Sequence, residues 1–273
     1  MARNKQELKE LIEELPIFEK RDVQTRNGTE ESVEEWTTQK ELAICSIKTD
    51  EAFAYVSPNY KLIQFKDIFT PMLESIPEEV KGYLVNYGGF AMLKVFPEIE
   101  SLKEGNSRFG LVAMNSVDLS SSIVVKFCVE HNELQFTIPT KIAGLKKSHV
   151  GKVDQLIKDY ISMVGKVKQT WKLIINEFPK YKVVLAKKDE EEEAVLEFGD
   201  VMEKLKIGKH LSKKLMKDYE IITADNKQYT LWDVFVKAVE EVSKKEYKSD
   251  VHREKKIDKI CQAIFEFSFA LGI

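Results

Sequence analysis

Apolar and polar residues alternate most regularly over residues 109–138. In the stretch SIVVKFCV every second residue is apolar and falls on one face of an extended strand, namely Ile123, Val125, Phe127 and Val129. After a polar turn at 130–133, Leu134, Phe136 and Ile138 again share a face. The pattern predicts a β-meander of three strands with one fully apolar face.

The spacing becomes that of a helix beyond Gly144. Ser148 is suited to cap a helix, and apolar residues then recur three and four positions apart from Val153 to Phe178. Pro179 ends the pattern. We therefore expect one long helix laid across the apolar face of the meander, with lysines on its outer side.

The first hundred residues predict shorter elements. Helical spacing near the N-terminus stops at Pro16, and Asn27-Gly28 predicts a tight turn in a polar arm, either a hairpin or an extended segment. The other expected elements are strands at 43–48, 52–57 and 83–96, the last interrupted at Gly88-Gly89, a short strand or strand end at 60–65, and a helix at 65–76.

The C-terminal third has a mostly helical pattern. The charge run KKDEEEE at 187–193 has nothing to bury, which is typical of a solvated loop or linker. Beyond it, Thr230 is placed to cap a helix, with Asp233 three residues on. A last helix is expected over 252–271.

Together these patterns predict an α+β fold, in which an antiparallel β-meander is packed by one long helix and followed by a mostly helical C-terminal region. We expect four consecutive segments: an N-terminal helix and polar arm at 1–42, an α+β core at 43–182, an acidic linker at 183–194 and a helical region at 195–273.

Composition places the chain among globular, cytoplasmic proteins. The 273 residues are 43% hydrophobic and 32% charged, and no apolar run approaches the ~20 residues that span a bilayer. The N-terminus lacks the apolar stretch of a secretory signal. Three widely spaced cysteines, Cys45, Cys128 and Cys261, fit neither a disulfide framework nor a zinc motif, so we expect them to be reduced.

Charge is distributed unevenly along the chain. Residues 1–140 carry 15 Lys and Arg against 23 Asp and Glu, whereas residues 141–182 carry 10 lysines against three acidic residues. Lysines lead from the last strand into the start of the long helix, where free N–H groups favour anions: Lys141, Lys146, Lys147 and Lys152. We predict a phosphate-binding track from these residues, joined by Arg108 and Lys126; the alternative is a solvated helix face.

Catalytic motifs are missing from the sequence. There is no GxxxxGK[ST] loop, and the four histidines, His131, His149, His210 and His252, are not at metal-ligand spacing. Ser120-Ser121-Ser122 lacks the context of a nucleophile. We therefore expect a protein that is not an enzyme and that needs no cofactor or metal. A third hypothesis is a nuclease or another metal-dependent enzyme. It would require a cluster of acidic residues at the strand ends, and the sequence shows no such cluster.

Two stretches resemble a family of phage and plasmid proteins of unknown function. YVSPNYKLIQFKDIFTPMLESI is similar to the strand and helix that open that family's core, and NSVDLSSSIVVKFCVEHNELQF resembles its central hairpin. Ser148-His149-Val150-Gly151 and TLWDVFVKAVEEV are similar to its helix start and its late helix. The chain departs from the family at His131-Asn132-Glu133, where a cysteine and an Asn-Gly pair are usual. The resemblance implies a viral or mobile-element origin.

The predicted architecture is also similar to the core of single-strand annealing proteins of viruses and eukaryotes, which hold DNA along a basic groove. The hypothesis from the sequence is thus a single-stranded DNA binding and annealing protein of the recombination type, acting as a homo-oligomeric ring or filament without a membrane. The alternative is a structural protein of a mobile element whose C-terminal helices dock a partner protein.

Overall fold

The computed structural model describes residues 3–27, 35–76, 79–119, 122–139, 144–147, 160–186, 194–245 and 250–272. It confirms the α+β class, with mainly antiparallel sheets, one short parallel pair of strands at 182–184 and 195–197, and a helical C-terminal region. The chain forms two compact units. Unit 1 comprises Met1–Glu100, Gly110–Lys126 and Gly144–Tyr160, and unit 2 comprises Ser101–Phe109, Phe127–Ala143 and Ile161–Ile273. Both units are therefore assembled from segments distant in the sequence, whereas the sequence predicts four consecutive ones.

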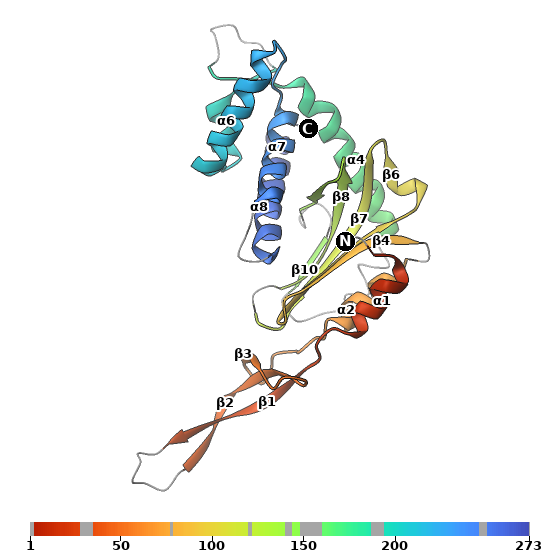
Figure 1. Ribbon diagram of the computed structural model, residues 1–273, viewed down its shortest axis with the longest axis vertical. Helices are drawn as coiled ribbons and strands as arrows, with labels where there is room; N and C mark the ends of the chain where they lie inside the picture. The colour runs from red at the N-terminus through yellow and green to blue at the C-terminus, as the bar shows by residue number, and fades with distance from the viewer. Residues whose placement is uncertain are drawn as a thin grey trace. The chain divides into compact units, whose positions relative to one another are not determined.

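The largest sheet has seven strands (Figure 1). Five follow the order β10-β8-β7-β5-β4, while β6 pairs with β7 and β9 pairs with β8. Their bounds are β4 Val80–Asn86, β5 Phe90–Pro97, β6 Lys103–Glu104, β7 Ser107–Ser116, β8 Ile123–His131, β9 Leu134–Thr137 and β10 Gly144–Lys147. The succession β7, β8, β9 confirms the predicted meander, and the Gly88-Gly89 break lies between β4 and β5.

Two helices of unit 1 bury apolar side chains. Helix α1 (Lys5–Glu13) begins with a capping box in which Asn4 and Glu7 satisfy each other's backbone N–H groups. Its Leu8 packs on β4, where a Cβ on Gly82 would lie 2.6 Å from the leucine side chain and 2.8 Å from the backbone oxygen of Lys94, and the approach to that backbone oxygen requires glycine. Helix α2 (Lys66–Glu74) contains the predicted Pro71 and buries Ile68, Phe69, Met72 and Leu73.

The polar arm forms a β-ribbon in unit 1. Strands β1 (Phe18–Asn27) and β2 (Glu35–Ser46) pair antiparallel, and β3 (Ala52–Val56) completes a three-stranded sheet. Phe18 anchors this sheet, because its backbone N–H donates to Gln64 Oε1 at 3.0 Å and its carbonyl accepts from Gln64 Nε2 at 2.9 Å. The Phe18 ring also meets Phe53 and Phe65 edge-on. The expected strand at 60–65 is not formed.

Unit 2 combines the ends of β7 and β8, strand β9 and the C-terminal helices. Its remaining elements are the short helix η1 (Glu100–Leu102), α4 (Tyr160–Glu177), η2 (Phe178–Lys180), strands β11 (Lys182–Val184) and β12 (Val195–Glu197), α5 (Phe198–Lys204), α6 (Lys209–Ala224), α7 (Leu231–Lys244) and α8 (Asp250–Ala270). Helices α7 and α8 lie side by side (Figure 1). Thr230 and Asp233 form the predicted capping box of α7.

The predicted long helix corresponds to α4, which is described from Tyr160; its expected start at Ser148 lies outside the described residues. Trp171 of α4 is fully buried and its ring lies 5.3 Å from that of Phe136 on β9. The start of the predicted acidic linker is structured, since Val183 is buried in β11; residues 187–193 lie outside the described ranges.

Candidate nucleic-acid interface

Strand β10 carries two of the predicted phosphate-binding lysines. It is the end strand in the order of the main sheet and pairs antiparallel with β8, placing Lys146 opposite Val124 and Lys147 opposite Ile123. Lys141 and Lys152 lie outside the described residues. The structure thus describes the sheet position of one adjacent pair of lysines from the predicted track.

Arg108 belongs to unit 2 and is engaged in an ion pair. Its guanidinium Nη2 donates to Glu130 Oε1, with the two side chains 23% and 11% exposed. Gln135 Nε2 also lies 3.3 Å from the other carboxylate oxygen, Glu130 Oε2. Because a carboxylate already neutralises Arg108, this arginine is poorly suited to a phosphate contact.

Lys126 lies within the sheet of unit 1. It stands opposite Gly144 in the pairing of β8 with β10, and only 2% of its surface is exposed. Both faces of β8 are buried from Ile123 to Val129, so Lys126 does not reach solvent although it lies on the face opposite to the predicted apolar one. Lys94 on β5 is similarly buried. Lys126 is therefore not presented to a DNA backbone.

A serine and a histidine that are far apart in the sequence, and that no sequence motif links, lie in contact in unit 2. Ser107 Oγ lies 2.8 Å from His131 Nδ1 and accepts a hydrogen bond from Trp171 Nε1 at 2.9 Å. Asn132 Nδ2 lies 3.1 Å from His131 Nε2. Because the Asn132 amide donates a hydrogen bond to Nε2, that nitrogen is unprotonated. The ring proton is therefore on Nδ1, and this N–H donates a hydrogen bond to Ser107 Oγ.

This arrangement opposes a nucleophilic role for Ser107. A general base would need an unprotonated nitrogen facing the hydroxyl, and Ser107 is 0% exposed. Burial lowers the pKa of His131 below its ordinary value, which favours the neutral ring. The histidine also packs against the rings of Trp171 and Trp232, at 6.1 and 5.5 Å. The group has the features of a buried hydrogen-bonded junction joining α4 to β7 and β8.

The loop after β3 and the end of β7 contact each other in unit 1. Asn115 Nδ2 donates to the Ile63 carbonyl at 2.9 Å, and Asn115 is fully buried. Burial, and then the nearby carboxylate of Asp118, raise the pKa of Tyr60 to about 12. The Gly89 carbonyl accepts from the Val117 N–H at 2.8 Å. These residues connect the loop after β3 to the end of β7 within unit 1.

The close approach at Gly89 explains why glycine stands there. A Cβ at this position would lie 2.7 Å from Asp118 Cβ and 2.8 Å from the Phe53 ring. Any larger residue at position 89 would push this turn away from Phe53 and Asp118.

Within the described ranges, no three His, Cys, Asp or Glu side chains are grouped so as to hold a metal ion. Across that same portion of the chain, no helix is both long and apolar enough to span a membrane. Comparison with models of protein families, with characterised proteins and with solved structures gives no match for this chain.

Proposed function

We propose that the protein binds single-stranded DNA and anneals complementary strands, acting as a homo-oligomeric ring or filament. The observation that carries this proposal is the position of Lys146 and Lys147 on β10, the end strand of the main sheet. Both lie within the stretch 141–182, which holds ten lysines and three acidic residues. Lysines along one strand edge are suited to follow a phosphate backbone.

The proposed contact set is narrower than the one predicted from the sequence. Lys141, Lys146, Lys147 and Lys152 remain in it, because they are consecutive cationic positions around β10. Arg108 is left out since Glu130 neutralises it, and Lys126 is left out since it is buried. Phosphate contacts of this kind neutralise and extend a strand while its bases stay available for pairing, so annealing needs no cofactor.

We also propose a viral or mobile-element origin, which the two family-like stretches support. The second candidate function is docking of a partner protein by the C-terminal helices. In that case the lysines near β10 would be a solvated surface, and nucleic acid affinity would be weak and indifferent to strandedness.

The proposal is tested by fluorescence anisotropy with labelled single- and double-stranded oligonucleotides across a range of salt concentrations. We expect salt-sensitive binding that prefers the single strand. Reversing both charges in Lys146→Glu/Lys147→Glu should lower the magnitude of the slope of log affinity against log salt by about 1.4, the value for two lost phosphate contacts.

The matched control is Lys9→Glu/Lys48→Glu, which changes net charge equally at two exposed lysines elsewhere in unit 1. This control should keep the wild-type slope. An equal loss of slope in both variants would mean that net charge alone governs binding. Absence of binding at low salt would overturn the DNA proposal and leave partner docking.

A further inference from the structure

A cavity of about 300 Å³ lies in unit 2, between the start of α6, the end of α7 and the first half of α8. Its apolar lining includes Val242 and Ile260, which are buried. Six of its lining residues are lysines or histidine: Lys206, Lys209, His210, Lys214, Lys245 and Lys256. A concave site with an apolar floor and converging polar groups is the usual form of a small-ligand site.

The charges around this cavity are unbalanced. Glu241 is the single carboxylate among the lining residues, and it is already paired with Lys214. Lys206, Lys209 and Lys256 are exposed and have no side-chain partner within the described part of the chain. Among the described residues no acidic side chain is paired with these three cations, and a bound anion would reduce the repulsion between them.

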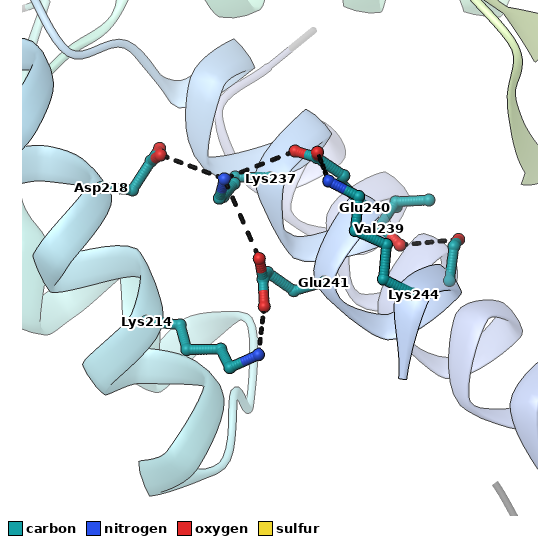
Figure 2. A network of polar contacts seen from close by, with 8 residues as sticks. Lys214, Asp218, Lys237, Val239, Glu240, Glu241 and Lys244 are labelled. Carbon is teal, nitrogen blue, oxygen red and sulfur yellow. Dashed lines mark hydrogen bonds and ion pairs between the residues drawn. The ribbon is translucent and has the colours of Figure 1, made fainter. Parts of the chain in front are cut away.

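The adjoining surface of α6 and α7 is balanced by contrast (Figure 2). There Lys237 Nζ lies 3.3 Å from Asp218, 3.5 Å from Glu240 and 3.9 Å from Glu241. Lys244 pairs with Glu240 in the same network. Lys214 is the last lysine of this balanced network and also lines the cavity. The lysines that lack acidic partners among the described residues therefore lie on the cavity side of Lys214.

Helix α6 also begins at the cavity without a cap. Its N-cap residue is Gly208, which has no side chain to accept from the first turn, and that turn contains no acidic residue. The backbone N–H groups of Lys209, His210 and Leu211 have no acceptor among the described residues. Residues 208–211 all line the cavity, so the uncapped start of α6 and the lysines border the same concavity.

Lys206 occupies a backbone conformation that usually selects glycine. Its φ is 51°, and it ends α5 in a Schellman motif, in which the Lys206 N–H donates to Glu203 O and the Ile207 N–H donates to Met202 O. A lysine at this position is strained, yet it contributes a cation to the cavity.

We propose that this cavity binds a phosphate group carried on an organic molecule. The lysines and the α6 N–H groups would take the phosphate, and the apolar floor would take the attached group. The phosphate has two sources, a small phosphorylated metabolite or the 5′ end of a nucleic acid strand. This inference does not rest on the proposed function, because the cavity lies in unit 2 whereas Lys146 and Lys147 lie in unit 1.

The test is isothermal titration calorimetry of the full chain at low salt with pyrophosphate, AMP and adenosine. We expect pyrophosphate and AMP to bind and adenosine not to bind. Lys256→Gln should weaken AMP binding about tenfold, as expected for loss of one charge-assisted contact. The control Lys213→Gln changes an exposed lysine of α6 that does not line the cavity, and it should bind as the wild type does.

Two variants separate binding from folding. Gly208→Asp supplies a carboxylate at the helix start, so it should raise thermal stability and abolish AMP binding. Lys206→Gly relieves the strained backbone, so it should also raise stability while weakening binding. The proposal is overturned if neither phosphate ligand binds, if adenosine binds as well as AMP, or if Gly208→Asp keeps wild-type affinity.

Short oligonucleotides with a 5′-phosphate or a 5′-hydroxyl distinguish the two sources. A preference for the 5′-phosphate that Gly208→Asp removes would identify a strand end as the source. AMP binding without such a preference would identify a small metabolite. Failure of the DNA proposal would give a different result. Either the wild-type protein would not bind the 5′-hydroxyl strand, or Lys146→Glu/Lys147→Glu would bind that strand as tightly as the wild type does.

Discussion

The turn between β8 and β9 shows how a single residue can store strain. His131 pairs with Leu134, which leaves the two-residue loop Asn132-Glu133, and both residues have positive φ, at 47° and 69°. Such type I′ turns favour Asn at the first position and Gly at the second. Glu133 lacks that freedom, so the turn is strained by about 1 kcal/mol.

Replacing this residue should therefore stabilise the protein. We expect Glu133→Gly to raise the free energy of unfolding by about 1 kcal/mol, because glycine adopts the left-handed conformation without a Cβ clash. Urea denaturation followed by tryptophan fluorescence measures the change. Glu79→Gly, at an exposed glutamate whose φ is not positive, should give no such gain. A destabilised Glu133→Gly variant would show that the glutamate side chain makes a contact that outweighs the strain.

Among secondary-structure elements, the junction of Ser107, His131 and Trp171 joins α4 to β7 and β8. Trp171 is fully buried, and its Nε1–H donates to Ser107 Oγ. Leaving a buried donor without its acceptor costs about 1–3 kcal/mol, which is more than the hydrogen bond itself contributes.

A double-mutant cycle tests the junction. Ser107→Ala should lower the free energy of unfolding by about 1–3 kcal/mol, because Trp171 Nε1 loses its acceptor. Trp171→Phe should cost more, since it also leaves a cavity. The double variant should be more stable than the sum of the two losses predicts, because neither partner is then left unpaired. Strictly additive losses, measured by urea unfolding, would contradict a direct interaction between the two side chains.

Much of the element order follows from local pattern. The meander, the Gly88-Gly89 break and the Thr230–Asp233 cap were predictable because each depends on residues close together in the chain. The sequence pattern did not reveal that both faces of β8 are buried, since burial depends on elements packed from elsewhere. The charges of Lys126 and Arg108 suggested phosphate contacts for the same reason. Lys126 is buried and Arg108 is paired with Glu130, and neither property can be seen in the sequence.

The cavity in unit 2 could not be predicted from the sequence, because its lysines come from α6, α8, the turn before α6 and the residue that follows α7. One local signal was present. In KIGKH a glycine stands at the N-cap and is followed by Lys209 and His210, where an acidic first turn would favour the helix.

The response of the whole molecule to acid follows from two kinds of group. Burial lowers the pKa of His131 below 6.5, so the unfolded chain binds a proton more readily and stability is lost as pH falls through 6.5. The hydrogen bond from Lys244, opposed by burial and reinforced by Lys237, lowers the pKa of Glu240 below 4.5. That contribution is present above 4.5 and is lost only at lower pH.

We therefore expect the free energy of unfolding to decline as pH falls from about 7.5 to about 5.5, before the carboxylates titrate. His131→Gln removes the titrating ring, so it should flatten this part of the profile. Urea unfolding at a series of pH values measures the slope in both proteins. An unchanged slope in the variant would assign the pH dependence to other groups.

The two units alternate along the polypeptide, and this limits how the protein can be divided. Two of the boundaries fall inside β7 and β8, each of which contributes residues to both units. No single cut in the chain separates one unit from the other. A fragment containing only the C-terminal helices would lack Ser107, His131 and Phe136, which belong to the same unit as Trp171. The helices are thus not a transferable module, and exchanging them between proteins would require exchanging the strands that precede them.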